Sequence, residues 1–356
     1  MRLENCAVLG AGAGGCAVAA DLSLAGIEVN LYELPEFQEN VQPIIHRGGI
    51  EIRGKARQGL AKLNKVTTDI REAIRDVRYL FVTVQAVGHE IIAERCAPYL
   101  EDGQAIVLFP GSAGSLQIAK TLKDVDVRKS IFIGEAVTLP YQCDLVGPAE
   151  VDVWGVTGPN NYFSAFPAKD TEKIIDDLRT VYPSLCPATN VLEVGLLNPN
   201  IVKHPMILFS IARLEFSNEP FCLNREGMTP SVWKVFNNVD AEKMAILKQL
   251  GLNALSDMEL LARILPISYD EWVTLNPKRV MSVKSRFITE DVPIGMVLLS
   301  SIGKMIGVNT PTIDSIIHLC SVINETDYYK QGRTVKKLGI SGMNVETLNK
   351  FLDKGR

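Results

Sequence analysis

The residues best suited to chemistry stand at the start of the chain, where three glycines follow one another at a fixed spacing. Gly10, Gly12 and Gly15 keep the G-x-G-x-x-G pattern, and the acid Glu33 follows them. In dinucleotide-binding folds the first glycine permits a tight turn, the second admits a pyrophosphate and the third allows close helix–sheet packing. The N–H groups and the dipole at the start of the following helix attract phosphate. The spacing therefore predicts a dinucleotide site.

Glu33 indicates which dinucleotide this site binds. A carboxylate at this position accepts hydrogen bonds from the adenosine ribose hydroxyls and repels a 2′-phosphate. Residues 34–37 contain no arginine that would attract such a phosphate. NAD is therefore favoured over NADP. We also expect Val84 to line the cofactor, because it ends an apolar strand and ligands bind at the carboxyl ends of parallel strands.

A hydride-transfer reaction also needs a group that donates or accepts a proton, and His204 is the candidate. Pro205 follows it and either begins a helix or kinks one. If a helix continues through this point, Asn200 and His204 share a face. If a helix begins there, the positive end of its dipole helps His204 to stay neutral. Both geometries suit an acid–base group, and an ordinary structural histidine remains the alternative.

The chain contains 4 histidines, and the other three are expected to have structural roles. His46 precedes two glycines and is expected on the surface. His89 is expected at the start of a helix. His318 stands among isoleucines and a leucine, which is typical of a histidine in a core.

A charged stretch at residues 284–295 offers possible partners for His204. Arg286 could bind a substrate carboxylate through a two-point fork. Asp291 could orient His204 and stabilise its charged form. The mixture of charges with proline and glycine predicts a loop, and a solvent-exposed ion pair is the alternative interpretation.

The elements that must position these residues change in kind along the chain. Up to about residue 190, apolar strand-like runs alternate with helical segments, which predicts an open parallel sheet with helices on both faces. Beyond that point helical spacing dominates. We therefore expect an α/β protein with an NAD(P)-binding Rossmann domain at 1–190 and a mostly α-helical substrate domain at 191–356. The expected strands are 7–9, 28–32, 79–84, 105–109 and 130–134, with an edge strand at 150–156.

Two threonine–proline pairs mark the start of helices in the second half of the chain. Thr229 precedes Pro230 and Thr310 precedes Pro311, and each pair is followed by an apolar helical run. Threonine is a favoured N-cap, and proline is favoured at the first helical position. Both threonines are therefore expected to cap a helix.

Composition excludes several classes of protein. The 356 residues are 47% hydrophobic and 22% charged, with a net charge of −4, so no basic field favours nucleic acid or a membrane surface. No apolar run has the length of about 20 residues that a membrane span needs. The first strand begins almost at Met1, so we expect no signal peptide. The 7 cysteines are widely spaced, which favours free thiols in the cytoplasm and no metal site.

Taken together, these motifs resemble the opine dehydrogenases, and in length and motif order most closely the bacterial N-(1-carboxyethyl)norvaline dehydrogenase type. The likeness extends over essentially the whole chain. In the first half it involves Gly10–Gly15, Pro110–Gly111 and Gly134–Glu135. In the second half it involves Asn198-x-Asn200-x-x-x-His204-Pro205, Gly227-x-Thr229-Pro230, Val239–Glu242, Arg286-x-x-x-Glu290-Asp291-Val292, Thr310-Pro311-x-x-Asp314 and Gly332–Gly339.

The resemblance implies an activity and a role for each residue. The expected reaction condenses the amine of an amino acid with a 2-oxo acid such as pyruvate, and NADH reduces the resulting imine. His204 would be the general acid–base group, Asp291 its partner, and Arg286 a contact for the substrate carboxylate or for the cofactor side of the site. Glu135 and Asn200 would contact substrate. Ala136 and Gln85 depart from the family pattern, which leaves the amino-acid partner open, and a homodimer is compatible with the helical half.

Two other functions remain open at this point. A hydroxy-acid or glycerol-3-phosphate-like dehydrogenase would share the two-domain plan and would use Lys203, the neighbour of His204, as its catalytic group. A non-catalytic protein that binds NAD as a signal would bind NADH without turnover. An absolute requirement for an amine in the assay separates the first function from both of these.

Overall fold

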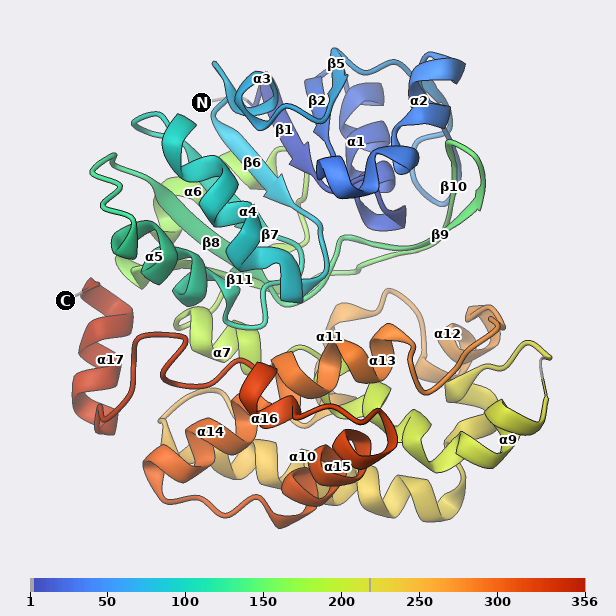
Figure 1. Ribbon diagram of the computed structural model, residues 1–356, viewed down its shortest axis with the longest axis vertical. Coiled ribbons are helices and arrows are strands. Elements are labelled where there is room, and N and C mark those ends of the chain that lie inside the picture. Colours follow the sequence, from blue (N-terminus) through green and yellow to red (C-terminus); the bar gives the residue numbers. More distant parts are fainter. Residues whose placement is uncertain (1–2, 218, 356) are drawn as a thin grey trace. The chain divides into compact units, whose positions relative to one another are not determined.

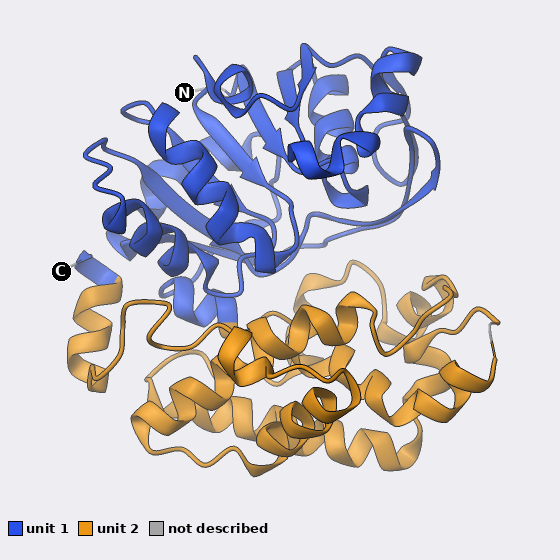
Figure 2. Ribbon diagram, viewed as in Figure 1, with its two compact units in different colours: residues 1–195, 353–355 blue, residues 196–352, 356 orange. Residues whose placement is uncertain are grey.

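The computed structural model describes residues 3–217 and 219–355. The chain divides into two compact units, residues 1–195 with 353–355 and residues 196–352 (Figure 2). We describe each unit by itself. None of the helices in the described ranges combines the length and the apolar character that a membrane span needs.

The first unit is built on an 8-stranded sheet whose order is β12-β11-β8-β7-β6-β1-β2-β5 (Figure 1). From β5 to β8 all neighbouring strands are parallel, whereas β11 runs antiparallel to β8. The expected doubly wound fold is confirmed, but one edge of its sheet is mixed. Its strands are β1 (Asn5–Leu9), β2 (Glu28–Tyr32), β5 (Lys65–Thr67), β6 (Tyr79–Val82), β7 (Ala105–Leu108), β8 (Phe132–Ala136), β11 (Asn161–Phe166) and β12 (Leu185–Pro187).

Successive residues of a strand point to opposite sides of the sheet, and here both sides are apolar. Helices therefore cover both faces. On one face, Val8 and Phe81 share an apolar core with residues of α1 and α6. On the other face, Leu9 and Val82 pack in a second core with α3, α4 and α5. The helices are α1 (Ala13–Leu24), α2 (Gln42–Arg47), α3 (Ile70–Ile74), α4 (His89–Cys96), α5 (Gly114–Asp124), α6 (Thr171–Arg179) and α7 (Val191–Leu196), with short 3-10 segments at η1 (Pro35–Asn40), η2 (Ala86–Gly88), η3 (Ala97–Tyr99) and η4 (Ala168–Asp170).

A second, 4-stranded sheet corrects the expectation of an edge strand at 150–156. That segment is a strand, β10 (Glu150–Val156), but it lies inside a separate sheet of order β4-β3-β10-β9. The other members are β3 (Ile50–Gly54), β4 (Gly59–Ala61) and β9 (Tyr141–Gly147). Asp21 of α1 ties this sheet to the main fold, because its carboxylate accepts hydrogen bonds from Tyr141 Oη at 2.7 Å and from Arg57 Nη1 at 2.8 Å.

The second unit contains helices only, apart from one isolated bridge between Phe221 and Arg279, within the part of the chain that the structure describes. The α-helices are α8 (Asn200–Lys203), α9 (Ile211–Phe216), α10 (Pro230–Gln249), α11 (Asp257–Ile264), α12 (Tyr269–Leu275), α13 (Arg286–Thr289), α14 (Val297–Ile306), α15 (Pro311–Ile323), α16 (Tyr328–Gln331) and α17 (Val345–Lys354). A 3-10 helix η5 (His204–Ser210) and two π-helical turns, η6 (Leu223–Gly227) and η7 (Val292–Met296), connect them.

Two expectations about this unit are wrong. Residues 284–295 do not form a loop, because they contain α13 and most of η7. Thr310 does not cap α15 with its side chain. Instead the Glu242 carboxylate, from α10, accepts hydrogen bonds from the N–H groups of Thr312 and Ile313. Thr229 does cap α10, as expected, and its hydroxyl accepts from the Val232 N–H.

Candidate active site

The glycine turn of the first unit has the shape that a pyrophosphate requires. Gly10 leaves β1 with a φ of 116°, a conformation that favours glycine. A Cβ on Gly15 would stand 1.8 Å from the Gly10 carbonyl oxygen, so α1 can pack this closely only without a side chain there. A Cβ on Gly12 would meet nothing within 4 Å, which leaves open space at the start of α1. Phosphate oxygens fit this space, because the first N–H groups of a helix have no partners within the helix.

Glu33 lies beside this turn, at the carboxyl end of β2. Its Oε2 accepts hydrogen bonds from the Ala11 N–H at 3.0 Å and from Asn40 Nδ2 at 3.0 Å, and its Oε1 accepts from the Leu34 N–H at 2.9 Å. These contacts hold the carboxylate in one position next to the turn. β6 ends at Val82, two residues earlier than expected, so Val84 lies in the turn after the strand and does not end it. Val84 is next to the glycine turn, since a Cβ on Gly10 would stand 2.9 Å from its Cγ1. The structure thus brings Val84 against the glycine turn, which Glu33 also touches.

Glu135 is fully buried at the end of β8. Its carboxylate accepts hydrogen bonds from the N–H groups of Ala113 and Ser115, each at 2.8 Å, and from the Ser115 hydroxyl at 2.5 Å. The carboxylate therefore holds the turn that leads into α5. Its contact with an amino-acid substrate stays a prediction.

In the second unit, His204 and Asp291 form a pair although 87 positions separate them. His204 Nδ1 lies 2.7 Å from Asp291 Oδ2. His204 begins η5 directly after α8, and Asp291 stands between α13 and η7. The side chains of His204 and Asp291 are 14% and 7% exposed. Because Asp291 engages Nδ1, Nε2 is the ring nitrogen that remains for a substrate.

Burial controls the protonation of this pair. It lowers the pKa of His204 well below the usual range, and the positive charge of Arg286 lowers it further. Burial raises the pKa of Asp291 to about 7, although Arg286 acts in the opposite direction. A buried pair of this kind favours zero net charge, with one proton shared between the two groups. Near neutral pH it can therefore release that proton and take it back, which is what an acid–base catalyst does.

Phe287 and Arg286 complete the surroundings of His204. The Phe287 ring stacks on the imidazole, with ring centroids 3.6 Å apart and an interplanar angle of 5°. The Arg286 side chain is 52% exposed, and its Nη1 lies 3.4 Å from Glu290 Oε2. An exposed ion pair of this length is weak. The guanidinium can therefore exchange Glu290 for the carboxylate of a substrate.

Asn200 opens α8, one helical turn before His204, and is partly exposed. Its backbone N–H donates to Asn198 Oδ1 at 3.0 Å. The chain changes from an α-helix to a 3-10 helix between Lys203 and His204, with Pro205 in the first turn of the new helix. The sequence left open whether a helix continues through Pro205 or begins there. The structure is intermediate, because the helical path continues but changes its type at His204.

Lys203 occupies a closed environment that argues against a catalytic role. Its side chain is 5% exposed, and its Nζ lies 3.6 Å from Asp257 Oδ2. The same Nζ lies 4.8 Å from the centre of the Tyr269 ring and 5.5 Å from that of Trp272. Acid and aromatic faces thus hold this ammonium group inside the unit. The alternative dehydrogenase with Lys203 as its catalytic group is not favoured.

The other histidines differ in part from expectation. His46 is exposed and His89 begins α4, both as expected. His318 is exposed on α15, so the expectation of a core histidine is wrong. Its apolar neighbours Ile316 and Ile317 point into the core, and the helical period carries His318 away from them.

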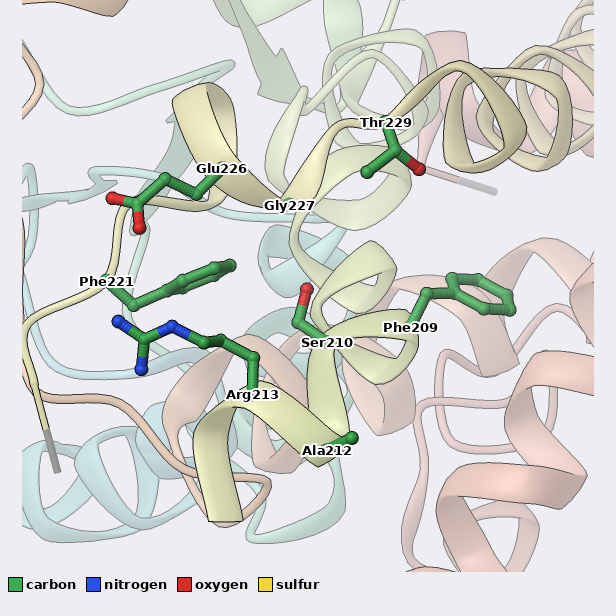
Figure 3. A pocket seen from close by; sticks show the side chains of 8 residues that line it. All are labelled: Phe209, Ser210, Ala212, Arg213, Phe221, Glu226, Gly227 and Thr229. Atoms are coloured by element: carbon green, nitrogen blue, oxygen red, sulfur yellow. The ribbon is translucent and has the colours of Figure 1, made fainter. Parts of the chain in front are cut away.

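Phe287 and Asn40 are residues near the candidate sites that the sequence did not single out. Phe287 stands in the stretch that the sequence predicted to be a charged loop, and no motif marks Asn40. Only the fold brings their side chains to His204 and Glu33. A separate cavity of about 370 Å³ lies in the second unit, and the Ser210 hydroxyl points from η5 toward Gly227 in it (Figure 3). None of its lining residues was predicted from the sequence to be catalytic or to bind substrate or cofactor: Phe209, Ser210, Ala212, Arg213, Phe221, Glu226, Gly227 and Thr229.

Comparison with known proteins finds two family models and several relatives that match this chain. A family model described as the alpha-helical domain of NAD/NADP octopine/nopaline dehydrogenase matches residues 187–324. A ketopantoate reductase PanE/ApbA model matches residues 6–152. The chain is 35% identical to an opine dehydrogenase of Arthrobacter sp. (strain 1C) over 347 residues, which cover 95% of each protein.

Two further relatives cover almost the whole chain. Protein ocs of Agrobacterium tumefaciens (strain Ach5) is 25% identical over 368 residues and 99% of each chain. A solved structure of octopine dehydrogenase with NADH and L-arginine has a TM-score of 0.77 at 18% identity, over 99% of this chain and 98% of that one. At 18% identity this structural similarity shows only that the two folds are alike.

Proposed function

Because this chain belongs to the opine dehydrogenase family, we propose that it joins the amine of an amino acid to a 2-oxo acid such as pyruvate and reduces the product with NADH. It is an oxidoreductase that acts on CH–NH groups. The observation that carries the catalytic assignment is the 2.7 Å contact between His204 and Asp291. The hydroxy-acid alternative has no comparable support, because Lys203 is enclosed by Asp257 and aromatic rings.

Proton transfer is the part of the reaction that we assign to this pair. The amine must lose a proton before its nitrogen attacks the carbonyl carbon of the 2-oxo acid, and the carbinolamine must gain one before water leaves. An unprotonated His204 Nε2 accepts the first proton, and the protonated pair delivers the second. NADH then supplies a hydride to the carbon of the protonated imine. The sum consumes one NADH and one proton and releases one water.

Arg286 and Asn200 complete the proposed substrate contacts. A guanidinium binds a carboxylate through two parallel hydrogen bonds, and Arg286 has enough exposure to do so. Asn200 stands one turn before His204 and offers an amide to the amino acid or the oxo acid. In this proposal Glu135 holds the start of α5 and also contacts the amino-acid substrate.

The first unit fits the dinucleotide. We propose that the N-terminus of α1 and Gly12 receive the pyrophosphate, that Glu33 binds the adenosine ribose, and that Val84 lines the site. The division into an NAD(P)-binding part at 1–190 and a substrate part at 191–356 belongs to the same proposal. We also place the enzyme in the cytoplasm, because all of its cysteines are free thiols.

The decisive assay follows NADH absorbance with pyruvate and each of the twenty amino acids in turn. We expect oxidation of NADH only when an oxo acid and an amine are both present, with a secondary-amine dicarboxylate as the product by mass spectrometry. Turnover with the oxo acid alone would favour the hydroxy-acid alternative. NADH binding without turnover on any mixture would favour a binding protein.

Gly15 and Gly12 form a matched pair that separates folding from cofactor binding. Gly15→Ala is expected to destabilise the protein by about 1–3 kcal/mol or more, because the new Cβ would overlap the Gly10 carbonyl. Gly12→Ala is expected to leave the urea unfolding curve unchanged and to weaken NADH binding by at least about tenfold, because its Cβ enters the phosphate space. NADH fluorescence titration and urea unfolding measure the two effects. Equal effects of both substitutions on stability would contradict this assignment.

Glu33 is expected to set the preference for NADH. Glu33→Gln keeps the shape of the side chain and removes the charge that repels a 2′-phosphate. We expect the ratio of kcat/KM for NADH to that for NADPH to fall by about tenfold or more, since like charges placed together cost several kcal/mol. Glu36→Gln is the matched control, because Glu36 is a nearby acid that pairs with Arg95. An unchanged ratio in Glu33→Gln would remove Glu33 from the ribose site.

We further propose that the helical unit carries the interface of a homodimer. The basis is that α15 exposes Leu319 and Val322, which are 46% and 63% exposed. An interface that covered these two side chains would remove apolar surface from water, which favours association. Light scattering on the purified protein measures the mass directly, and a monomer at micromolar concentration would contradict this part of the proposal.

A further inference from the structure

Phe287 is in closer contact with His204 than an ordinary packing residue would be. The two rings are nearly parallel at 5°, and their centroids are only 3.6 Å apart. Phe287 is not a core side chain, because it is only partly buried, whereas the next residue, Ile288, has no exposed surface. Ile288 is the residue of α13 that packs into the core of the helical unit. The ring of Phe287 therefore has a role other than filling the core.

One short segment holds His204 from two directions. Phe287 lies in α13 and faces the plane of the imidazole, whereas Asp291 follows α13 and binds the ring edge at Nδ1. Backbone hydrogen bonds keep this segment in shape, from the Glu290 N–H to the Arg286 carbonyl and from the Ile294 N–H to the Glu290 carbonyl, at 3.0 and 2.9 Å. The two contacts to His204 are therefore made by a single rigid piece of the chain.

The two contacts restrict different motions. A hydrogen bond to Nδ1 tolerates tens of degrees of misalignment, so it leaves the imidazole free to tilt. A parallel ring at van der Waals distance removes that tilt. Since a displacement of about 1 Å at a reacting group can cost about 100-fold in rate, control of the tilt matters for Nε2.

We propose that Phe287 is a positioning residue for the acid–base group: its stacked ring fixes the plane of His204 so that Nε2 faces the substrate while Asp291 holds Nδ1. This inference rests on the proposed function, because it assigns Phe287 a role only through His204. The aromatic face also attracts the imidazolium that forms during each turnover. Phe287 thus supports both the direction of the proton transfer and the charged state in the middle of it.

Charged groups around the pair must be kept constant in any test of this role. Asp291 contacts the imidazole, and four further charges act on it. They belong to Arg286 in α13, Glu290 directly after α13, Lys203 in α8 and Arg279 in the segment before α13. The Arg286 guanidinium carbon lies 5.9 Å from the centre of the Phe287 ring. Substitutions at Phe287 should therefore be uncharged. Cofactor affinity is a better control than oxo-acid affinity, because Arg286 is a proposed contact of the oxo acid.

The test compares Phe287→Leu, which keeps an apolar side chain but lacks a planar face, with Phe287→Tyr, which keeps the ring. We expect Phe287→Leu to lower kcat by about 10- to 100-fold and Phe287→Tyr to stay within about threefold of the wild type. The dissociation constant of NADH should stay unchanged in both, and the thermal midpoint should fall by no more than about 5 °C, since an aromatic pair contributes about 0.5–1.5 kcal/mol. The acid limb of the pH–rate profile should move to lower pH in Phe287→Leu, because the imidazolium loses an aromatic face.

A double-mutant cycle with His204→Ala separates positioning from general packing. Phe287→Leu should cause no further loss of kcat in the His204→Ala background, because it acts only through the imidazole. A normal kcat in Phe287→Leu, equal losses in the Leu and Tyr variants, or a further loss in the His204→Ala background would each overturn the proposal. If Phe287→Leu does not fold, Phe287→Met takes its place with the same expected results. An inactive wild type, or an active His204→Ala variant, would contradict the proposed function itself.

Discussion

Replacing His204 with alanine is expected to lower kcat by about 10²- to 10⁴-fold, the range that a positioned acid–base group contributes. The substitution removes the Nε2 that takes a proton from the amine and the partner that shares a proton with Asp291. The dissociation constant of NADH should change by less than about twofold, because the dinucleotide site is proposed in the other unit. Steady-state kinetics and fluorescence titration measure the two quantities.

His46→Ala is the matched control for this experiment. His46 is exposed on α2, away from the residues assigned to either site. It should keep wild-type kcat, so that a loss in His204→Ala cannot be ascribed to the removal of any histidine. Weaker NADH binding in His204→Ala with turnover retained would count against the acid–base role.

The second large effect is expected from Asp291→Asn, at about 10²- to 10⁴-fold in kcat. An amide keeps the size of the side chain but loses the charge that selects the Nδ1–H tautomer and stabilises the imidazolium. The acid limb of the pH–rate profile should also move to lower pH, because an imidazole without a neighbouring carboxylate is harder to protonate. Asp270→Asn, an exposed acid of α12, should leave both quantities unchanged.

The pH dependence of stability gives Asp291 a second signature. Burial raises the pKa of this carboxyl to about 7 in the folded protein. A raised carboxyl pKa adds stability at low pH, below the unfolded pKa, and this contribution is lost as the pH rises through about 7. In Asp291→Asn the free energy of unfolding should therefore fall less between about pH 4 and pH 7 than it does in the wild type. Parallel curves would show that the carboxyl is not perturbed.

The arrangement also explains why two neighbouring residues have different roles. Lys203 and His204 are adjacent in sequence, and dehydrogenase chemistry could have used either of them. The junction between α8 and η5 sends the ammonium group into a pocket of Asp257 and aromatic rings, whereas His204 keeps some exposure. The fold thus selects an imidazole that can exchange protons over an amine that is already paired.

The sequence by itself determined the features that depend on residues close together in the chain. The glycine spacing specified the turn into α1, because Gly10 needs a positive φ and Gly15 tolerates no side chain. The Thr229–Pro230 pair specified the start of α10, because a cap requires only neighbouring N–H groups. The alternation of apolar runs and helical segments is also a pattern of neighbouring residues, and it predicted the doubly wound sheet.

Only the tertiary structure decided which distant residues meet. Three features of the structure join segments that lie far apart in the chain. They are the contact of His204 with Asp291 and Phe287, the placement of β10 in a second sheet, and the capping of α15 by Glu242. Nothing in a local pattern distinguishes Phe287 from a core phenylalanine. Such contacts arise from the packing of whole elements against one another. Local spacing therefore specifies the cofactor turn, whereas the geometry of the acid–base group appears only when the chain is folded.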